Sequence, residues 1–473
     1  MPSTRRDLLK SAPALAAASQ ATAQPAGEKP NIILIISDQF RADLVGAMGM
    51  NPMNLTPNLD AMARRGVLFR SAYCSQPVCA PARGSIFTGQ YPARHGVWRN
   101  GLGLAEGANT LAGSLRNAGY STNYIGKWHL SPASVQQHQQ PEAGPVPRPQ
   151  RGGFLDLWEG ANALEHTSHA YDGDLWDSDG KPIHFSGIYR ADFLTQRAQR
   201  FLRAAKAPFF LTISHLEVHH QNDSDTFDPP KEFKGRYPNP FVPQDLRALP
   251  GSWPSQLSDY LACVAKVDET VGTLRRTLAE TGLDRNTILV FMSDHGNHFK
   301  TRNTEYKRSP HESSIHVPVI AEGPGFNRAA QVRDLVSQVD LMPTLLDAAG
   351  VAAPASVQGH SAMPLLDNRG TAWRNEIYFE MAEFVTGRGL RTPQYTYAVM
   401  APKERGWKPV ARAGKYVEYV LYDNYADPFQ LVNLSGRREY QKIAEELRAR
   451  LLARMREAGD PPATIEPCWF PYS

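Results

Sequence analysis

Four apolar runs, each followed by polar residues, constrain the fold of this chain more than any other feature. They cover residues 31–37, 120–125, 209–214 and 287–293. A near-continuous apolar run indicates a strand that is buried on both faces, as in a parallel sheet. Amphipathic helical patterns lie between the runs, at residues 58–65, 111–118, 191–204 and 256–281. This alternation predicts an α/β fold with a large, doubly wound, mixed or parallel sheet flanked by helices.

Polar residues that could take part in catalysis or binding follow each predicted strand. They are Asp38-Gln39, Lys127-Trp128-His129, His215 with His219-His220, and Asp294-His295-Gly296. In doubly wound sheets, ligands bind outside the carboxyl ends of the strands. We therefore expect the four polar groups to converge on one site.

The chain is long enough for one large hydrophobic core and a smaller subdomain, since it has 473 residues of which 42% are hydrophobic. Residues 131–151 and 222–254 read as long loops that could form walls of a substrate site. A helix is expected at residues 338–346.

The pattern changes after residue 371. Shorter strands are expected at 376–380, 395–400 and 416–422, before a helix at 439–458. One face of that helix is apolar and carries Ile443, Leu447, Leu451, Leu452 and Met455. We expect a catalytic α/β domain over residues 30–370 and a C-terminal α+β subdomain over residues 371–473.

The first 23 residues have the pattern of an export signal. Arg5-Arg6 resembles a twin-arginine pair, an Ala-rich stretch follows at residues 11–19, and Ala21-Thr22-Ala23 offers a cleavage site. The pattern predicts a periplasmic or secreted protein, exported by the twin-arginine route in the folded state. No later segment approaches the roughly 20 apolar residues that span a membrane.

Charge and cysteine content exclude two classes of protein. The net charge is +4, to which the leader contributes Arg5, Arg6 and Lys10 against Asp7, so nothing indicates a nucleic-acid partner. Four cysteines are too few for a disulfide scaffold, and no Cys-x-x-Cys pair suggests structural zinc.

The surroundings of Cys79 indicate a site rather than a packed thiol. Pro81 suits the first turn of a helix that we expect from Ala80 to Phe87, ending at Thr88-Gly89. Cys79 would then lie where free N–H groups and the helix dipole favour an anion. Taken alone, such a residue is more often a buried apolar cysteine.

The spacing of Cys79, Pro81 and Arg83 resembles the site at which sulfatases convert a cysteine to formylglycine. Gly119–His129 is similar to the second signature of that family, and Asp38-Gln39 and Asp294-His295 resemble its metal-binding pairs. Further similar stretches are Lys307 with Glu312 and Val317-Pro318, residues 339–346, and residues 421–434. The chain thus resembles the sulfatases of the alkaline phosphatase superfamily from about residue 30 to residue 434.

This resemblance implies a nucleophile and a metal. Cys79, converted by a formylglycine-generating enzyme and then hydrated, would supply the hydroxyl that attacks sulfur. A divalent metal would be held by Asp38, Gln39, Cys79, Asp294 and His295, and would lower the pKa of the nucleophile. Asp294 would also help to deprotonate it.

The resemblance also implies roles for the remaining polar residues. Lys127 and Lys307 would hold sulfate oxygens, and His219 would protonate the leaving group, although His220 is an alternative for that role. Arg83 would orient the hydrated aldehyde. His129 would help its second hydroxyl to expel sulfate.

Three positions depart from the family pattern. Gln39 stands where many sulfatases have Asp, His295 stands where others have Asn, and Ala82 replaces a common Ser. Oxygen ligands favour Ca²⁺, whereas an imidazole leaves Mn²⁺ or Zn²⁺ open. Gln39 also resembles the corresponding residue of choline sulfatases and phosphonate monoester hydrolases.

We therefore expect a sulfuric ester hydrolase that acts on a sulfated small molecule or, more specifically, a sulfated carbohydrate. The carbohydrate rests on the long loops and on Trp98, Arg99, Asn100, Trp158 and Trp176, which could hold sugar rings or could belong to the core. One alternative is a phosphonate monoester or phosphodiester hydrolase that uses the same aldehyde. Another is a sulfated-glycan-binding protein whose Cys79 is never modified.

Overall fold

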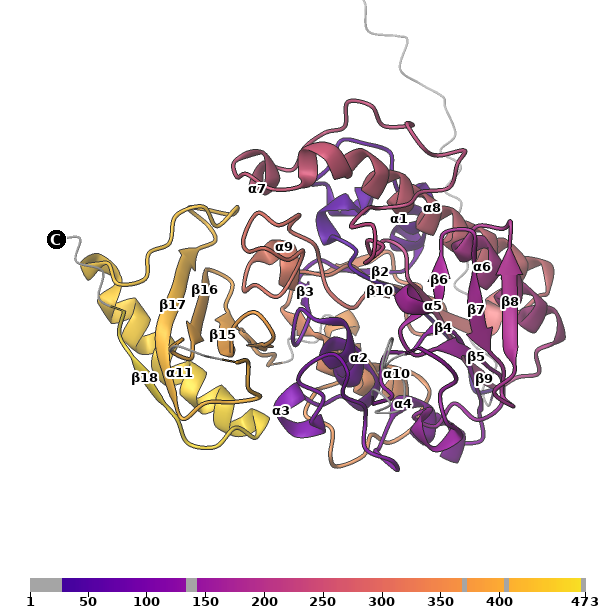
Figure 1. Ribbon diagram of the computed structural model, residues 1–473. Helices are drawn as coiled ribbons and strands as arrows, with labels where there is room; N and C mark the ends of the chain where they lie inside the picture. The colour runs from indigo at the N-terminus through magenta and orange to yellow at the C-terminus, as the bar shows by residue number, and fades with distance from the viewer. Residues whose placement is uncertain (1–27, 133–142, 368–371, 404–407, 469–473) are drawn as a thin grey trace, which may run out of the picture.

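The computed structural model describes residues 28–132, 143–367, 372–403 and 408–468 (Figure 1). Its centre is a mixed 11-stranded sheet in the order β12-β2-β11-β10-β1-β9-β4-β5-β7-β6, with β8 paired to β7. The predicted α/β class is confirmed. The export signal expected at residues 1–23 lies outside the described residues.

The four predicted apolar strands lie side by side and are parallel to one another. Their order is β10 (Thr287–Ser293), β1 (Asn31–Ser37), β9 (Phe209–His215) and β4 (Ser121–Lys127). Ser37 is in register with both His215 and Ser293, so the residues after these strands meet at one edge of the sheet. The bounds of the first and last strands agree with the prediction, whereas β4 starts one residue and ends two residues later than expected.

Gly126 allows β4 to approach β9 closely just before Lys127. Its φ is +107°, and a Cβ atom added there would lie 2.0 Å from the carbonyl oxygen of Ser214. A side chain at this position would therefore push the end of β4 away from β9.

Shorter strands extend this sheet on both sides. On one side are β2 (Val67–Phe69), β11 (Val319–Glu322) and β12 (Ala330–Val332); on the other are β5 (Trp158–Ala161), β6 (Ser168–His169), β7 (Asp172–Trp176) and β8 (Pro182–Ser186). A separate pair is formed by β3 (Ala72–Tyr73) and β13 (Val336–Ser337). The sequence patterns did not predict the strands from β5 to β8, which surround the site on that side.

Helices cover both faces of the large sheet. They are α1 (Pro57–Arg65), α2 (Cys79–Thr88), α3 (Pro92–His95), α4 (Leu111–Asn117), α5 (Leu164–Thr167), α6 (Arg190–Ala204), α7 (Gln244–Arg247), α8 (Trp253–Glu280), α9 (Glu312–Ile315) and α10 (Leu341–Ala348). The predicted helices at 58–65, 111–118, 191–204 and 256–281 correspond to α1, α4, α6 and α8, and the one at 338–346 corresponds to a 3₁₀ turn followed by α10.

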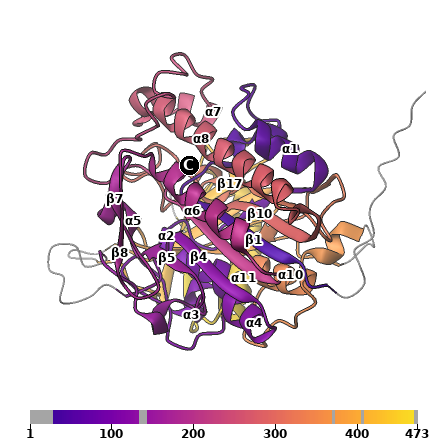
Figure 2. The ribbon, with the colours of Figure 1, turned by 90° about the vertical axis from the view of Figure 1, so that its right-hand side faces the viewer.

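Alternate residues of β1 face two different cores. Ile32, Leu34 and Ile36 pack with side chains of α2, α4 and α10, while Ile33 and Ile35 pack with side chains of α1, α6 and α8. Figure 2 shows α6 and α8 on one side of β1 and β4, with α4 and α10 on the other. This two-sided burial is the reason why the strand reads as a continuous apolar run.

A second sheet follows in the C-terminal region. Its strands are β14 (Ile377–Met381), β15 (Gly387–Arg391), β16 (Tyr395–Met400), β17 (Lys415–Asp423) and β18 (Thr464–Glu466), and it packs against α11 (Gln441–Ala458), at the left of Figure 1. β15 and β18 were not expected from the sequence. The buried residues of α11 include Leu447, Leu451 and Met455, as predicted, whereas Ile443 and Leu452 are half-buried.

The second sheet also packs against the main core. Phe379 of β14 belongs to the core of α2, α4 and α10, while its neighbour Tyr378 packs in the core of α11. The division at residues 370/371 falls within 368–371, outside the described residues, so the two-domain organisation stays a prediction.

Two further expectations are corrected or completed. Residues 222–254 are not entirely irregular, because they contain α7 and the first turn of α8. All four cysteines carry free thiols. None of the helices within the described ranges is long and apolar enough to cross a membrane.

Candidate active site

Cys79 is the first residue of α2, not the residue ahead of it. The helix ends as predicted, with Gly89 in the left-handed conformation after Thr88. Cys79 is only 1% exposed, and all ten residues of α2 are buried. The helix therefore presents the Cys79 side chain to a buried site at the carboxyl edge of the large sheet.

Arg83 lies one turn after Cys79 on α2 and ties the ends of several strands together. Its Nε donates to Asp294 Oδ2 at 3.0 Å, and one terminal nitrogen donates to Asp38 Oδ2 at 3.2 Å. The other donates to the carbonyl oxygen of Lys127 at 2.9 Å and to Ser214 Oγ at 2.8 Å. The observed contacts of Arg83 thus fix the two carboxylates rather than the side chain of Cys79.

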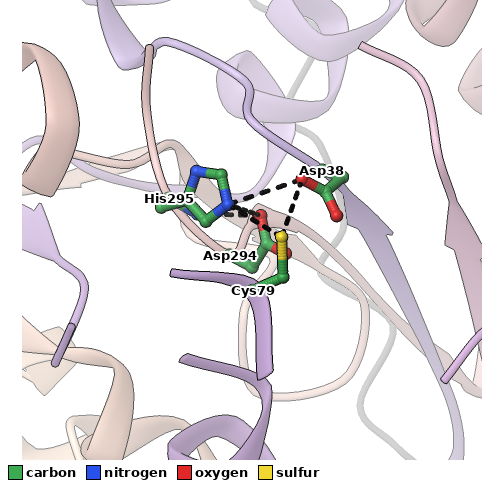
Figure 3. A group of neighbouring side chains, drawn as sticks. All are labelled: Asp38, Cys79, Asp294 and His295. Atoms are coloured by element: carbon green, nitrogen blue, oxygen red, sulfur yellow. Dashed lines mark hydrogen bonds and ion pairs between the residues drawn. The ribbon is translucent and has the colours of Figure 1, made fainter. Parts of the chain in front are cut away.

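Four side chains form a compact group of possible metal ligands. One ligand atom from each of Asp38, Cys79, Asp294 and His295 lies within 4.8 Å of the others, and all four residues are buried (Figure 3). Three of them follow β1 or β10 directly, and the fourth starts α2. No second group of this kind occurs elsewhere in the described part of the chain.

The donor atoms of this group fit a divalent cation. His295 Nδ1 lies 3.0 Å from the carbonyl oxygen of Gly296, a contact that leaves the lone pair of Nε2 toward Asp38 and Cys79. Asp38 uses Oδ2 for Lys127 and Arg83, and its Oδ1 faces Cys79 and His295. The remaining oxygens and the imidazole nitrogen are ligands that Ca²⁺, Mn²⁺ or Zn²⁺ accepts.

Gln39 supports the same fit. Its backbone lies in the left-handed region with φ at +67°, and its N–H donates to Asp294 Oδ1 at 3.1 Å. Both polar atoms of its side chain are buried, with no hydrogen-bond partner among the described residues. A buried amide without a partner is costly, and a metal ligated by its oxygen would remove that cost.

Two lysines approach Cys79, one from the end of β4 and one from the loop between β10 and α9. Lys307 Nζ lies 3.0 Å from Cys79 Sγ and 3.1 Å from His295 Nε2. Lys127 Nζ lies 3.8 Å from the same sulfur and 2.8 Å from Asp38 Oδ2. These ammonium groups place two positive charges beside the predicted nucleophile.

The charges around Cys79 change the pKa values of the site. Burial raises the pKa of the Cys79 thiol, but Lys127, Lys307 and His295 bring it well below its ordinary value. Burial and Cys79 also oppose ionisation of Asp38, yet Lys127 holds the pKa of that carboxyl well below its usual range. Burial raises the pKa of Asp294, and the charge of Asp38 adds to this effect. The site therefore favours anions where Cys79 lies.

His219 is the member of the histidine pair that reaches the site. Its Nε2 lies 3.1 Å from Lys307 Nζ, and its Nδ1 lies 2.5 Å from the carbonyl oxygen of His220. The His220 ring instead stacks between His219 and Tyr306, with centroids 4.3 and 4.2 Å away. Burial and then Lys307 lower the pKa of His219, so its imidazole is neutral with the Nε2 lone pair facing the site.

His129 also belongs to this group. It is buried in the left-handed conformation with φ at +61°, and its N–H donates to the carbonyl oxygen of Asn162 at 2.7 Å. Its side chain hydrogen-bonds Cys79 and helps to lower the pKa of the thiol. The structure therefore brings all of the predicted site residues together.

Glu165 of α5 is a site residue that the sequence analysis missed. Its Oε1 lies 2.7 Å from Lys127 Nζ, and its side chain is 4% exposed. β5, which pairs in parallel with β4 and ends at Ala161, brings α5 to the same edge of the sheet. The short strand at 158–161 was the only sequence signal for this position, and it is too short to stand out by pattern.

The residues expected to hold a sugar have different environments. Trp158 is fully buried in the main core, so of the two alternatives that the sequence left open for it, a core residue is confirmed. Trp176 is half-buried and lines an open hollow of about 460 Å³, together with His166, His169 and Asp172. Trp98 is half-buried and Arg99 lies over its ring, 5.5 Å from the centroid.

Comparison with known proteins places this geometry in a family context. The model of the family described as "Sulfatase" matches residues 30–351. A second model, described as "N-sulphoglucosamine sulphohydrolase, C-terminal", matches residues 304–457.

Similar proteins span nearly the whole chain. An ulvan-active sulfatase from Formosa agariphila is 31% identical over 91% of this chain and 82% of its own length. An N-acetylglucosamine-6-O-sulfatase from Bacteroides thetaiotaomicron is 27% identical over 94% of this chain and 90% of its own length. A solved structure in complex with its substrate, D-glucosamine-2-N,6-O-disulfate, is 25% identical, covers 91% of this chain and 98% of that chain, and has a TM-score of 0.72.

Proposed function

Since the chain belongs to the sulfatase family and is a sulfuric ester hydrolase, we propose that it removes sulfate from a sulfated carbohydrate with a formylglycine made from Cys79. One observation carries the proposal. The four donor atoms around Cys79 lie within 4.8 Å of one another, and Lys307 Nζ lies 3.0 Å from Cys79 Sγ. A nucleophile, a cation site and positive charge for the sulfate oxygens thus occupy one pocket.

We assign the metal to Asp38, Gln39, Asp294, His295 and the modified side chain at position 79. The mainly oxygen ligands favour Ca²⁺. When present, the aldehyde and the cation supply the hydroxyl nucleophile and the positive charge that makes it acidic. Arg83 orders this region by holding the carboxylates of Asp38 and Asp294 in one orientation.

The remaining roles follow from the charges and the hydrogen-bonding atoms of the pocket. Lys127 and Lys307 would bind sulfate oxygens, since their ammonium groups face Cys79 from two sides. His219 would donate the proton that the leaving oxygen needs, because its Nε2 points into the same space. His129 would accept a proton from position 79 when sulfate is expelled.

The carbohydrate substrate is supported by the relatives and by the surface near α5. Relatives with names that specify a substrate act on ulvan or on N-acetylglucosamine-6-O-sulfate. Residues of α5 lie in the site through Glu165 and line the open hollow beside it through His166 and Thr167, next to Trp176. A ring beyond the sulfated sugar could pack on Trp176 in that hollow.

The two alternative functions have weaker support. A solved phosphonate monoester hydrolase is similar at 20% identity, which shows the fold alone. A glycan-binding role without catalysis gives no reason for Lys307, His219 and the carboxylate pair to converge on Cys79. The sulfatase family model, in contrast, covers residues 30–351.

We propose that the protein acts in the periplasm or outside the cell, after export in the folded state by the twin-arginine route. The pattern of residues 4–23 supports this location. Conversion of Cys79 by a formylglycine-generating enzyme would then precede export.

We also propose a division into a catalytic domain at 30–370 and a subdomain at 371–473, supported by the separation of the C-terminal five-stranded sheet from the 11-stranded sheet.

Mass spectrometry of the Cys79 peptide, combined with a substrate panel, tests the proposed function. Protein from the native host should carry an aldehyde at position 79 and should hydrolyse sulfate esters faster than phosphodiesters or phosphonates. Cys79→Ala should lower turnover to below about one ten-thousandth of wild type, because the nucleophile is lost.

Cys263→Ala is the matched control. Cys263 is also a buried thiol, but it lies on α8 and should leave turnover unchanged. A dominant phosphodiesterase rate would overturn the sulfatase assignment. Normal turnover in Cys79→Ala would overturn the mechanism.

A further inference from the structure

Glu165 gives the pocket a third negative charge. Its carboxylate and that of Asp38 both contact Lys127 Nζ, at 2.7 and 2.8 Å. Burial opposes its ionisation, but Lys127, followed by His129 and His219, lowers its pKa to about 2. Glu165 is therefore an anion at neutral pH, and it lies outside the motifs that identify the family.

Only one oxygen of Glu165 is paired. Oε2 is buried and has no hydrogen-bond partner among the described residues. A buried carboxylate of this kind costs folding free energy, because part of its charge has lost water without gaining a donor. Stability alone therefore does not explain an acid at this position.

The charges that surround Cys79 explain it better. Three cations, Arg83, Lys127 and Lys307, face three carboxylates, Asp38, Asp294 and Glu165. With all six ionised, the charges of these side chains cancel, and the divalent cation proposed for the site adds the same charge with or without Glu165. Without Glu165, the pocket would hold one additional positive charge, beside the ammonium group of Lys127 that we assign to the sulfate.

Substrate esters differ in the charge that they bring to this pocket. A sulfate monoester carries one negative charge, whereas a phosphate monoester carries two above its second pKa of about 6. We propose that Glu165 sets the charge preference of the pocket, so that it accepts a monoanionic ester and disfavours a dianionic one. This inference rests on the proposed function.

Coulomb's law gives the expected size of this preference. A carboxylate that lies within several ångströms of a second substrate charge, in a partly screened interior, changes the relative preference by about 10- to 100-fold. Removal of the Glu165 charge should move Lys127 little, since Asp38 also holds its ammonium group, at 2.8 Å. The effect should thus depend on charge more than on shape.

Glu165→Gln tests the inference, because it removes the charge and keeps the shape. We would measure kcat/KM for 4-nitrophenyl sulfate and 4-nitrophenyl phosphate at pH 8. The ratio of phosphate to sulfate hydrolysis should rise about 10- to 100-fold in the variant. A monoanionic phosphodiester, methyl 4-nitrophenyl phosphate, should keep its ratio to the sulfate ester within about threefold, because it carries the same charge as the sulfate ester.

Two further variants separate charge from structure. Glu159→Gln removes another buried carboxylate, one that pairs with Arg197 and has 8% exposure, and should change neither ratio. Glu165→Asp keeps the charge, so its phosphate-to-sulfate ratio should stay near that of wild type even if its kcat falls.

Binding gives a readout that does not depend on turnover. In a Cys79→Ala background, calorimetry should show that Glu165→Gln increases the affinity for 4-nitrophenyl phosphate relative to 4-nitrophenyl sulfate. If Glu165 only positions Lys127, both Glu165 variants will lose activity on all three esters alike and the ratios will not move. That result would overturn the inference.

The wild-type enzyme provides a test that does not depend on whether a variant folds. It should hydrolyse the monoanionic phosphodiester with a higher kcat/KM than the dianionic phosphate monoester, and the reverse order would also overturn the inference. If wild type instead hydrolyses no sulfate ester, the proposed function fails, which is a different outcome from an unchanged ratio in an active enzyme.

Discussion

At the scale of single residues, the environment of His219 sets what its proton can do. Its Nδ1 pairs with the carbonyl oxygen of His220, while its Nε2 accepts from Lys307. The lysine charge and burial both favour the neutral ring in the free enzyme. A bound sulfate would offset the charge of Lys307, so substrate itself would favour the protonated imidazole that the leaving group needs.

His219→Ala should lower activity according to how much help the leaving group needs. We expect a loss of about 10²- to 10³-fold on an alkyl or sugar sulfate, and less than about tenfold on 4-nitrophenyl sulfate, whose leaving group needs no proton. Steady-state kinetics on both substrates measures this difference. His220→Phe, which keeps the stacking on Tyr306, is the control, and an equal loss on both substrates in His219→Ala would contradict the role in proton donation.

At the scale of elements, Asn100 connects the start of α2 to the C-terminal region. Asn100 Oδ1 accepts from the N–H of Ala80 at 3.1 Å, and the N–H of Asn100 donates to Glu383 Oε1 at 2.6 Å. Glu383 also pairs with Arg308, the residue after Lys307. One series of contacts thus connects the start of α2, the segment that carries Lys307, and the loop after β14.

Asn100→Ala should affect catalysis more than stability. Loss of this cap should cost about 1 kcal/mol of unfolding free energy and should lower kcat several-fold with little change in KM, because the first turn of α2 loses its fixed position.

Thr110→Ala is a matched control for the Asn100 variant. Thr110 caps α4 by accepting from the N–H of Gly113 at 3.0 Å, and its hydroxyl donates to the carbonyl oxygen of Gly152 rather than to a proposed site residue. It should cause a similar loss of stability, by urea unfolding, without a loss of kcat. Equal kcat values for the two variants would argue against a positioning role for Asn100.

The packing of α1 on α8 predicts a pH dependence of stability. Asp268 of α8 accepts hydrogen bonds from the N–H groups of Asn58 and Leu59, and its side chain is buried. Burial raises its pKa to about 6, although these N–H groups oppose the shift. Because the folded state holds this proton more tightly than the unfolded state, the contribution is fully present below about pH 4. It is lost as pH rises to about 6.

Urea unfolding between pH 4 and pH 7 tests this sign. The contribution of Asp268 should fall by up to about 3 kcal/mol over the interval, and Asp268→Asn should remove that part of the slope. A steeper fall in the variant, or an opposite slope in wild type, would mean that the N–H donors outweigh burial.

At the scale of the whole molecule, the C-terminal sheet is wedged between the main core and α11. Its strand β14 donates a hydrogen bond from the N–H of Glu380 to the carbonyl oxygen of Ser75, close to Cys79 in the chain. On the side toward α11, the buried Arg388 pairs with Asp460 through two hydrogen bonds of 2.5 and 2.8 Å. The sheet therefore connects the stability of the C-terminal region to the site.

Asp460→Asn should destabilise the whole protein by about 3–5 kcal/mol, because it leaves the buried Arg388 guanidinium with only the more distant carboxylate of Glu380, at 3.7 Å, as a counter-charge. Thermal unfolding measures the effect. Glu466→Gln breaks the exposed pair with Lys415, in which each side chain is 54% exposed, and should cost less than about 1 kcal/mol. Similar losses in the two variants would contradict the buried role of Asp460.

Much of the fold and of the site followed from local sequence patterns. The four apolar strands could be predicted because burial on both faces leaves a continuous apolar run, and α2 could be predicted from Pro81 and Gly89. The strands from β5 to β8 and the strands β15 and β18 could not, because short or half-exposed strands carry little periodic signal. Trp158 looked like a candidate sugar contact because burial is not visible in a single tryptophan.

The sequence by itself determined which residues stand at the carboxyl ends of the central strands, because a strand and its last residue are local features of the chain. Only the tertiary structure decided which of them touch. It directed Arg83 to the carboxylates, chose His219 over His220, and brought Glu165 to Lys127 across 38 residues of chain. Such contacts depend on how separate strands pair and how helices pack on them, and no spacing within a single segment encodes that arrangement.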